Sequence, residues 1–473
     1  MEGCSMQGVV LAAGQGVRMK SELPKVLFSL CGQPMVRYAV AALRDAGVAE
    51  PVVVVGEHAA SIEAVLGAHV RYAQQPVPRG TGDALRAALP LLPQQGDLLV
   101  TCADMPLLTG ATLTALAQWH QHSGAAITVL TAQLPNPQGY GRLVRDEGQV
   151  IAIVEERDAD PAQKQIHEVN TGVYCLRLQD VRPLLRQLTA ENAQGEYYLT
   201  DLVAAVVAQG GKVETLPVED FDEAMGVNDR WQLAQAQQRM QQRILRAWAL
   251  QGVSLLDPAS TYIDVTVQLA PDVTLLPGVV LEGETTVASG CVLGPNLRAT
   301  DSHFEEGVQA QYAVLNQASV GSRAQLGPFC YLRPGSVIGA DVKIGDFVEI
   351  KNSTIGAQSK VPHLSYVGDA RLGERVNMGC GSITVNFDGV SKHETIIGND
   401  VFVGCNVNLV APVQVQEGAY LAAGSTITDD VHKQALAIAR HRQINKEGYA
   451  AVLQKKHGEQ AVGGKESQRG NVP

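Results

Sequence analysis

From residue 263 the sequence reads Ile263-Asp-Val-Thr-Val-Gln, Leu269-Ala-Pro-Asp-Val-Thr, Leu275-Leu-Pro-Gly-Val-Val, Leu281-Glu-Gly-Glu-Thr-Thr, Val287-Ala-Ser-Gly-Cys-Val, with one aliphatic residue at every sixth position. This period matches neither the 3.6-residue turn of a helix nor the two-residue alternation of a strand. It is typical of a parallel β-helix, in which each aliphatic residue points into a narrow core and stacks on the next coil. Each coil is then a triangle with three short faces.

The six-residue frame is lost between Asn296 and Tyr312 and returns in two later blocks. Its later aliphatic positions are Val320, Leu326, Leu332, Ile338, Ile344, Ile397, Val403, Leu409, Val415 and Leu421. Chance does not easily produce so many repeats in frame. The sequence therefore predicts a left-handed parallel β-helix of hexapeptide repeats in the C-terminal half.

Length and composition restrict the class of protein. A chain of 473 residues is too long for one ordinary core, so we expect two or three domains. The net charge of −11 argues against nucleic acid or anionic membrane as a partner. The sequence has no run of eighteen apolar residues and no basic region before an apolar one at the N-terminus, so we expect a cytoplasmic protein. Eight cysteines without paired spacing are typical of reduced thiols.

The N-terminal motif is a buried strand that runs into a glycine turn, Gly8-Val-Val-Leu-Ala-Ala-Gly14, followed by Arg18 and Lys25. Backbone N–H groups in such a turn can approach phosphate oxygens, and the two cations neutralise their charge. A short Gly-x-Gly alone is equally typical of an ordinary strand-to-helix turn. The full string to Met19 is more specific, lacks the kinase and ATPase loop pattern, and resembles the fingerprint of sugar-1-phosphate nucleotidyltransferases.

Strands and helices alternate as far as residue 230. The expected strands are 51–55, 97–101, 126–131 and 213–217, and the expected helices include 35–46 and 110–122. This alternation predicts an α/β domain with a Rossmann-like, mostly parallel sheet and helices on both faces. Ligands of such folds bind beyond the carboxyl ends of the strands, where the glycine turn is expected.

Several polar residues are expected in loops over the same edge of the sheet. Asp104 follows the strand 97–101 and is, on local sequence alone, as well explained by a cap of the turn before Pro106 as by a magnesium ligand. The other candidate loops are 75–81, 140–142, 154–156, 169–172 and 226–228.

A long helix and a polar tail complete the domain plan. Residues 228–251 contain no Gly or Pro and predict one helix that ends at Gly252, with Leu233, Met240, Ile244 and Trp248 near one stripe. We expect an α/β domain at 1–230, a helical linker at 231–251, a repeat domain at 252–454 and a disordered tail at 455–473.

The repeat domain has its own candidate site. Polar residues occur at its turns, and the segment from Thr384 to His393 breaks the six-residue frame, as insertions with a function often do. His363 is a candidate general base, because imidazole titrates in the useful range. A lone histidine on a solvated turn is, by itself, more often without function.

In this order, these strings are similar to those of the bacterial bifunctional enzymes that make UDP-N-acetylglucosamine. Such an enzyme joins an N-acetylglucosamine-1-phosphate uridyltransferase to a glucosamine-1-phosphate N-acetyltransferase. The resemblance extends from Val9 to about Lys446 and includes Asn192-Ala-Gln-Gly-Glu-Tyr-Tyr-Leu-Thr-Asp201, a string specific to this family. It implies a role in supplying precursors of peptidoglycan and lipopolysaccharide.

The resemblance implies roles in both halves of the chain. In the first, Leu11, Ala12, Ala13, Gly14 and Lys25 hold the UTP phosphates, Gln75, Gly80 and Thr81 read the uracil, Asp104 and Asn228 hold Mg²⁺, and Gly141, Glu155 and Asn170 bind the sugar. Lys25, Arg18 and Mg²⁺ then promote in-line transfer of UMP from UTP, with release of pyrophosphate. In the second, His363 is the general base, Arg333, Lys351, Tyr366, Asn377 and Lys392 bind glucosamine-1-phosphate, and Cys380, Asn386, Phe387, Cys405, Ala423 and Arg440 contact acetyl-CoA.

The chain departs from the family pattern at a few site positions. At the nucleotide the family commonly has Tyr-Gly-Asp, and the resemblance places Cys102, Ala103 and Asp104 there, which keeps the metal ligand and loses a tyrosine contact. Phe387 replaces a tyrosine, Cys380 an alanine, Cys405 a serine and Pro362 a glycine. Loss of the hydroxyl at 387 removes a hydrogen bond worth about 1 kcal/mol.

The resemblance also implies a homotrimer with acetyltransferase sites between neighbouring subunits, and only small-molecule substrates. Three alternatives remain at this point. The repeat domain of a sugar nucleotidyltransferase could be only oligomerising or regulatory. A metal-binding β-helix of the carbonic anhydrase type requires three histidines, and His363 and His393 lack a third at repeat spacing. A protein that only binds ligands would leave both sets of enzyme-like residues unexplained.

Overall fold

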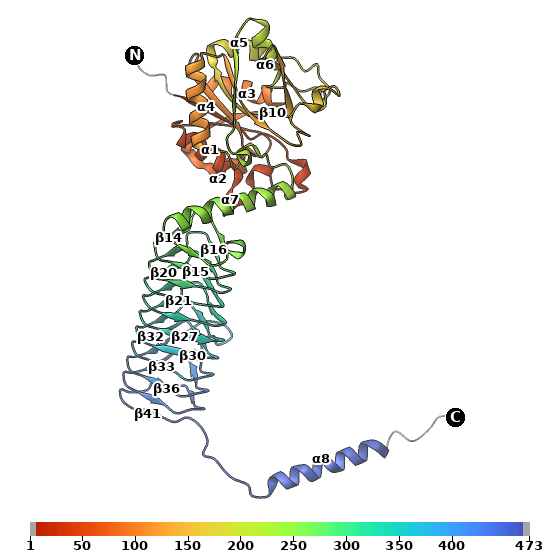
Figure 1. Ribbon diagram of the computed structural model, residues 1–473. Helices are drawn as coiled ribbons and strands as arrows, with labels where there is room; N and C mark the ends of the chain where they lie inside the picture. Colours follow the sequence, from red (N-terminus) through yellow and green to blue (C-terminus); the bar gives the residue numbers. More distant parts are fainter. Residues whose placement is uncertain (1–5, 467–473) are drawn as a thin grey trace, which may run out of the picture. The chain divides into compact units, whose positions relative to one another are not determined.

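The computed structural model describes residues 6–466, and its contacts divide the chain into two compact units between Asn316 and Gln317. The first unit contains an α/β fold, one long helix and the first coils of the repeat, and the second contains later coils (Figure 1). Among the described residues, no helix is long and apolar enough to span a membrane. The four domain ranges given above stay a prediction, because this division follows contacts alone.

The α/β fold is built on one mixed sheet. Its strands are β1 (Gln7–Leu11), β4 (Val52–Val55), β5 (Arg71–Gln74), β6 (Asp97–Cys102), β7 (Ile127–Gln133), β8 (Gly141–Asp146), β9 (Gln149–Val154), β10 (Glu168–Arg177) and β11 (Val213–Pro217). The order is β11-β7-β10-β6-β1-β4-β5, and the hairpin of β8 and β9 pairs with β10. β1 runs parallel to β4 and β6, whereas β10 is antiparallel to β6 and β7.

Helices cover both faces of this sheet, as predicted. They are α1 (Met35–Asp45), α2 (Ala59–Leu66), α3 (Thr81–Ala88), α4 (Gly110–Ser123), α5 (Leu178–Gln187) and α6 (Asp201–Ala208). Apolar residues of α1, α2 and α4 form one buried core with the strands, and those of α3, α5 and α6 form a second. A small hairpin of β2 (Ser29–Leu30) and β3 (Gln33–Pro34) precedes α1.

The strands β8, β9 and β10 correct the loops expected at 140–142, 154–156 and 169–172. Gly141 begins β8, Glu155 directly follows β9, and Asn170 lies inside β10. The polar run Asn170-Thr-Gly hides this strand from a simple apolar pattern, and the register of β10 against β7 shifts between Asn170 and Tyr174. Such a bulge redirects side chains without ending the strand.

The predicted linker helix is α7 (Arg230–Leu250). The carboxylate of Asp229 caps it by accepting a hydrogen bond from the backbone N–H of Gln232 at 2.8 Å. Leu233, Met240 and Ile244 of the expected stripe pack in one buried cluster with residues of the α/β fold. Packing of one face explains why this polar, glutamine-rich segment is a stable helix.

The repeats form the parallel β-helix that the sequence predicts. In the first unit its strands are β12 (Ser254–Leu255), β13 (Tyr262–Ile263), β14 (Gln268–Leu269), β15 (Thr274–Leu275), β16 (Val280–Glu282), β17 (Thr286–Val287), β18 (Val292–Leu293), β19 (Arg298–Thr300), β20 (His303–Phe304), β21 (Gln309–Ala310) and β22 (Ala313–Asn316). Every third strand pairs in parallel, so one coil has three short faces.

The second unit continues the same construction on three faces (Figure 1). Face one contains β24 (Gln325–Leu326), β27 (Lys343–Asp346), β30 (Lys360–His363), β33 (Asn377–Met378), β36 (Phe402–Val403), β39 (Tyr420–Leu421) and β41 (Leu436–Ala437). Face two contains β25 (Cys330–Leu332), β28 (Glu349–Lys351), β31 (Tyr366–Gly368), β34 (Ile383–Val385), β37 (Asn408–Val410) and β40 (Thr426–Ile427). Face three contains β23 (Ser319–Val320), β26 (Val337–Ile338), β29 (Thr354–Ile355), β32 (Ala370–Leu372), β35 (Thr395–Ile397) and β38 (Val413–Val415).

The frame positions are buried, and the stretch without a frame is also coiled. Regular coils pair residues 18 positions apart, such as Leu275 with Leu293. Where the frame is lost, Ala299 pairs with Leu315, only 16 positions later, and both side chains are buried. Shorter turns therefore alter the spacing without interrupting the core.

Part of the tail differs from the expected disorder. The helix α8 (Tyr449–Glu466) includes residues 455–466, and residues 467–473 lie outside the described residues. The run from Ala450 to Gln460 contains mainly good helix formers, Ala, Leu, Gln and Lys, which explains a local helix without packing.

Candidate functional site

A cavity of about 570 Å³ opens beyond the ends of β1 and β6. Of the residues expected at the nucleotide, its lining contains Leu11, Ala12, Ala13, Gly14, Arg18, Lys25, Gln75, Gly80, Thr81, Cys102, Asp104 and Asn228. Gln194 and Glu196 also line it, although sequence reasoning gave the string 192–201 no role. The fold thus gathers segments that are more than two hundred residues apart.

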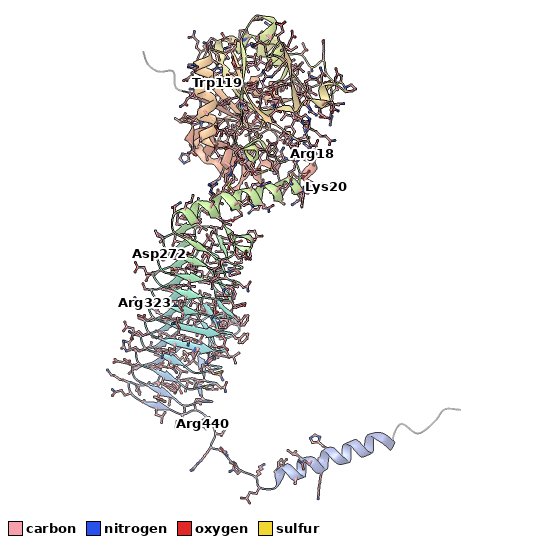
Figure 2. All side chains as sticks on the ribbon, in the orientation of Figure 1. Arg18, Lys20, Trp119, Asp272, Arg323 and Arg440 are labelled. Atoms are coloured by element: carbon pink, nitrogen blue, oxygen red, sulfur yellow. The ribbon has the colours of Figure 1, made fainter. Side chains whose placement is uncertain are left out.

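Two cations and two oxygen ligands form the charged centre of this cavity. The Nζ atom of Lys25 lies 2.5 Å from Oδ2 of Asp104 and donates to Oδ1 of Asn228 at 3.1 Å. A guanidinium N–H of Arg18 donates to the same amide oxygen at 2.8 Å. The backbone N–H of Val227 donates to the carbonyl of Asp104, which holds Asn228 beside it. Figure 2 labels Arg18 on its exposed turn.

The glycine turn is required by this packing. Gly16 has φ of +63°, and a Cβ atom there would lie 2.5 Å from Cβ of Lys25. Any larger residue would displace the lysine that contacts Asp104. The turn therefore positions Lys25 as well as exposing backbone N–H groups.

The residues Asp104 and Asn228 fit a magnesium ion. One carboxylate and one amide oxygen are the hard ligands that Mg²⁺ takes, with water and phosphate oxygens for the remaining positions. In the structure the ammonium group of Lys25 bridges the two oxygens, so the pair already attracts a cation. Among the described residues, no group of three or more His, Cys, Asp or Glu side chains is arranged for a metal.

Cys102 and Ala103, which differ from the family pattern, are described by their burial. Burial, and next the charge of Asp104, raise the pKa of the Cys102 thiol to about 12, so it stays protonated near neutral pH. Ala103 was expected at the nucleotide but is fully buried behind the lining, where its N–H donates to the carbonyl of Leu11. No covalent chemistry at Cys102 is therefore expected.

The three residues expected at the sugar, Gly141, Glu155 and Asn170, form a separate cluster. Gly141 pairs with Asn170 across β8 and β10, and a Cβ atom at Gly141 would lie 3.5 Å from Glu155. The hydroxyl of Thr200 donates to Glu155 at 3.1 Å, and the amide of Asn170 donates to the Tyr174 hydroxyl at 2.7 Å. None of the three lines the 570 Å³ cavity.

Glu155 gives a testable link between the site and stability. Burial raises the pKa of its carboxyl, with nearby Asp201 and Asp158 adding to the rise and Thr200 opposing it. The folded chain then holds this proton more tightly than the unfolded chain, so stability falls as pH rises from the ordinary glutamate range through the raised pKa. Above both values the buried charge costs stability.

We therefore expect Glu155→Gln to raise the melting temperature at neutral pH, and the gain to vanish in acid where both forms are neutral. Thermal unfolding of the two proteins at pH 4 and pH 7 measures this. An equal melting temperature at pH 7 would show that the carboxylate is not destabilised.

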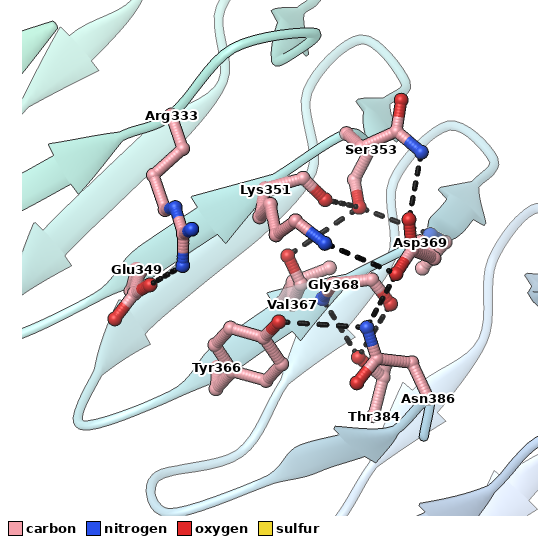
Figure 3. A network of polar contacts seen from close by, with 12 residues as sticks. Arg333, Glu349, Lys351, Ser353, Tyr366, Val367, Gly368, Asp369, Thr384 and Asn386 are labelled. Atoms are coloured by element: carbon pink, nitrogen blue, oxygen red, sulfur yellow. Dashed lines mark hydrogen bonds and ion pairs between the residues drawn. The ribbon is translucent and has the colours of Figure 1, made fainter. Parts of the chain in front are cut away.

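The second polar cluster lies on face two of the β-helix (Figure 3). One column of paired residues on successive coils contains Tyr331, Glu349 and Tyr366. Two positions further along each coil, a second column contains Arg333, Lys351 and Gly368. Arg333 donates to Glu349 at 2.8 Å, and the ammonium of Lys351 lies 3.5 Å from Asp369. The arrangement presents cations on one exposed face.

Asp369 and Lys392 complete this cluster. The amide of Asn386 donates to Asp369 at 2.5 Å and to the Tyr366 hydroxyl at 3.4 Å. Burial opposes ionisation of Asp369, but hydrogen bonds from Asn352 and Asn386 and the nearby lysines lower its pKa overall. A contact with Lys351 lowers the pKa of Lys392, because two ammonium groups repel each other. An anion would relieve that repulsion.

Gly368 allows Tyr366 to reach this cluster. A Cβ atom at Gly368 would clash with the hydroxyl oxygen of Tyr366. Only glycine at 368 therefore allows the Tyr366 ring to occupy this position. The backbone N–H of Gly368 is also hydrogen-bonded to Thr384 at 2.8 Å.

His363 ends β30 on face one and pairs in register with Asp346. Its Nδ1 atom lies 2.5 Å from Oδ1 of Asp346, and this hydrogen bond is the main reason that the pKa of Asp346 is lowered. An ionised carboxylate only accepts, so Nδ1 carries the proton and Nε2 is free to accept one. The side chain is 56% exposed, which leaves Nε2 accessible.

The remaining predicted residues occupy two corners and the first face. Asn377 begins β33 on face one, whereas Lys351 and Tyr366 are on face two, and no described contact joins them. Asn386 and Phe387 begin the inserted loop, which closes as Phe387 bridges to Lys392. Cys380, Cys405 and Ala423 stack on the three coils that follow His363, in the same column at the end of face one, as the register of β30, β33, β36 and β39 requires. Arg440 is exposed after β41 (Figure 2).

Comparison with known proteins covers both units. The family model of the MobA-like NTP transferase domain matches residues 8–201, and that of the bacterial transferase hexapeptide (six repeats) matches residues 317–352 and 394–429. The bifunctional protein GlmU of Caldanaerobacter subterraneus subsp. tengcongensis is 50% identical over 449 residues, which are 95% of this chain and 98% of that protein. The chain belongs to the GlmU family. The GlmU proteins of Brevibacillus brevis and Thermoanaerobacter pseudethanolicus are each 48% identical, over 95% and 96% of this chain and 98% and 99% of their own lengths.

Two acidic residues of the β-helix were missed by sequence reasoning. Asp346 precedes His363 by 17 positions, and Asp369 follows Lys351 by 18, so each lies one coil from its partner. The coil spacing itself was the signal that could have found them. Asp346 contacts the imidazole of His363, and Asp369 contacts the ammonium group of Lys351.

Asp346 should therefore be a positioning residue of this chain. We expect Asp346→Asn to lower kcat for acetyl transfer about tenfold to a hundredfold, less than the 10²–10⁴ that general base catalysis supplies, with little change in KM. Steady-state kinetics with acetyl-CoA and glucosamine-1-phosphate measures both constants. A rise in KM at constant kcat would instead assign Asp346 to substrate binding.

Proposed function

We propose that the chain catalyses two consecutive reactions that lead to UDP-N-acetylglucosamine. Acetyl-CoA first acetylates glucosamine-1-phosphate, and UMP then passes from UTP to N-acetylglucosamine-1-phosphate with release of pyrophosphate. The observation that carries this proposal is the match to proteins called bifunctional over 95% of the chain, which includes both polar clusters. The product would serve cell wall synthesis.

The cavity beyond β1 and β6 is the proposed uridyltransferase site. The sugar phosphate oxygen attacks the α-phosphorus of UTP in line, and the bond to pyrophosphate breaks. Lys25 and Arg18 neutralise charge on the phosphates, and the backbone from Leu11 to Gly14 holds them. Gln75, Gly80 and Thr81 face the base.

Asp104 and Asn228 hold Mg²⁺ in this proposal. A bound ion would supply positive charge that offsets the charge of the phosphates. Lys25, which contacts both Asp104 and Asn228 here, would then be free to contact the phosphates.

Gly141, Glu155 and Asn170 bind the sugar beside the nucleotide. The hydrogen bond from Cys102 to the carbonyl of Gly172 at 3.9 Å connects this cluster with the nucleotide cavity. Glu155 accepts from sugar hydroxyl or amide groups, and Thr200 orients its carboxylate.

His363 is the proposed base of acetyl transfer. The substrate amine attacks the thioester carbonyl carbon, Nε2 of His363 takes the amine proton, and coenzyme A leaves as a thiolate. Asp346 holds the imidazole and stabilises its charged form. Arg333, Lys351 and Lys392 supply the charge for the sugar phosphate, and Tyr366 and Asn377 contact the sugar.

Acetyl-CoA contacts the two corners that contain Asn386 with Phe387 and the column of Cys380, Cys405 and Ala423, and Arg440 binds its phosphates. We place complete sites between subunits of a homotrimer. The separation of Asn377 from the cluster on face two supports this arrangement, because one subunit does not join them. UTP and acetyl-CoA are metabolites of the cytoplasm, where we expect the protein to act.

Two separate assays test the proposal. Thiol release from acetyl-CoA with glucosamine-1-phosphate measures the first reaction, and pyrophosphate release from UTP with N-acetylglucosamine-1-phosphate and Mg²⁺ measures the second. We expect both. Pyrophosphate release without thiol release would favour the alternative, a nucleotidyltransferase whose β-helix is only oligomerising or regulatory.

Removal of divalent metal should separate the two activities. We expect EDTA to abolish pyrophosphate release and to leave thiol release unchanged, because the metal ligands proposed here belong to the first site alone. Added Mg²⁺ should restore the lost activity, and loss of both activities in EDTA would contradict the assignment.

A further inference from the structure

A second cavity of the α/β fold, of about 500 Å³, has a basic lining. It contains Arg86 of α3 and Arg182 and Arg186 of α5, and it shares no lining residue with the nucleotide cavity. No carboxylate lines it among the residues that the structure describes. In a chain with a net charge of −11, three arginines without an acid are unexpected.

Arg182 is 7% exposed and pairs only with neutral groups. Its guanidinium donates to the carbonyls of Leu89 at 3.3 Å, Leu92 at 3.1 Å and Pro93 at 2.6 Å. Its Nε atom is buried without a hydrogen-bond partner. Burial and the neighbouring Arg186 lower the pKa of Arg182, because no counter-charge offsets them.

Arg86 and Arg186 add positive charge to the cavity, and neither is paired with a carboxylate. Arg86 donates to the carbonyls of Leu185 and Leu188 and lies over the ring of Tyr197, 4.5 Å from its centroid. Arg186, one helical turn after Arg182, is exposed and has no partner among the described residues. The cavity thus combines two arginines held by backbone carbonyls with one free guanidinium, that of Arg186.

We propose that this cavity binds a phosphorylated small molecule. Its phosphate accepts from the free guanidinium of Arg186, beside the positive charges of Arg86 and Arg182, since guanidinium groups match the paired oxygens of a phosphate. Its organic part contacts Leu89, Pro90 and Leu92, which line the same cavity. One water molecule takes up about 30 Å³. The cavity of about 500 Å³ therefore has room for a phosphate group and an organic part together. The two reactions proposed above do not use this site.

Arg186→Gln is the informative variant, because Arg86 and Arg182 hold backbone carbonyls and their loss would disturb the fold. The full chain is titrated by calorimetry with glucose 6-phosphate, in EDTA and saturating UTP so that the nucleotide cavity is occupied. Glucose is the neutral probe. Arg37→Gln is the matched control, since Arg37 is an exposed arginine that donates to one carbonyl, that of Val65.

We expect wild type and Arg37→Gln to bind glucose 6-phosphate alike and Arg186→Gln to lose at least one binding component, or to bind about tenfold more weakly. Binding of the phosphate at the cluster of face two persists in Arg186→Gln and does not affect the comparison. Equal binding by wild type and Arg186→Gln overturns the proposal. So does equal binding of glucose, or the absence of any binding by wild type.

Discussion

Replacement of His363 by alanine should abolish acetyl transfer and leave uridylyl transfer unchanged. General base catalysis contributes about 10²–10⁴ in rate, and no other described imidazole lies on the same corner. The base belongs to the second unit, whereas every residue of the nucleotide cavity belongs to the first. Thiol release and pyrophosphate release on the same preparation measure the two effects.

His432→Ala is the matched control for this variant. His432 is an exposed turn histidine of the same unit, and the structure assigns it to neither site. We expect it to keep both activities. If His363→Ala retained acetyl transfer near the wild-type rate, the base would have to be another group.

Asp104→Asn should have the opposite effect, a loss of uridylyl transfer by about 10²–10³ or more with acetyl transfer intact. The change keeps the size of the side chain but removes the charge that attracts Mg²⁺ and holds Lys25 at 2.5 Å. Pyrophosphate release over a range of Mg²⁺ concentrations tests the assignment, because weaker metal binding shifts the requirement upward.

Asp180→Asn controls for the loss of a carboxylate in the same unit. Asp180 pairs with Arg177 at 3.7 Å on the surface of α5, and such exposed pairs contribute little to stability. We expect wild-type kinetics from it. An Asp104→Asn protein with an unchanged Mg²⁺ requirement would mean that the carboxylate only caps its turn, the alternative that local sequence left open.

The β-helix was predictable because its physical cause is local and repeated. Each coil buries one aliphatic residue per face. The spacing of one coil between Leu275 and Leu293 is therefore enough to predict that they pair. Even the stretch without a frame obeys the rule once the turns of a coil are allowed to lose two residues in all, as Ala299 and Leu315 show. The same coil spacing also predicts that Asp346 lies beside His363, but the sequence analysis did not use it.

The α/β fold was less predictable from pattern. The parallel strands β1, β4, β6, β7 and β11 were found from their apolar residues. The parallel strand β5 (Arg71–Gln74) is a polar run and was not predicted, and β10 contains a polar bulge and was taken for a loop. The contact between Lys25 and Asp104 joins residues 79 positions apart, and no local rule places them together. Their meeting depends on the pairing of β1 with β6, which brings the two strand ends side by side. Only the resemblance to a known family anticipated it.

The measurement that tests the two-site proposal most directly is mass spectrometry of the products formed from glucosamine-1-phosphate, acetyl-CoA, UTP and Mg²⁺, beside a reaction without UTP. The account predicts UDP-N-acetylglucosamine in the complete mixture and N-acetylglucosamine-1-phosphate when UTP is omitted. Absence of any acetylated sugar from both mixtures would contradict it, and would leave at most a uridyltransferase carried on a β-helix without catalytic activity.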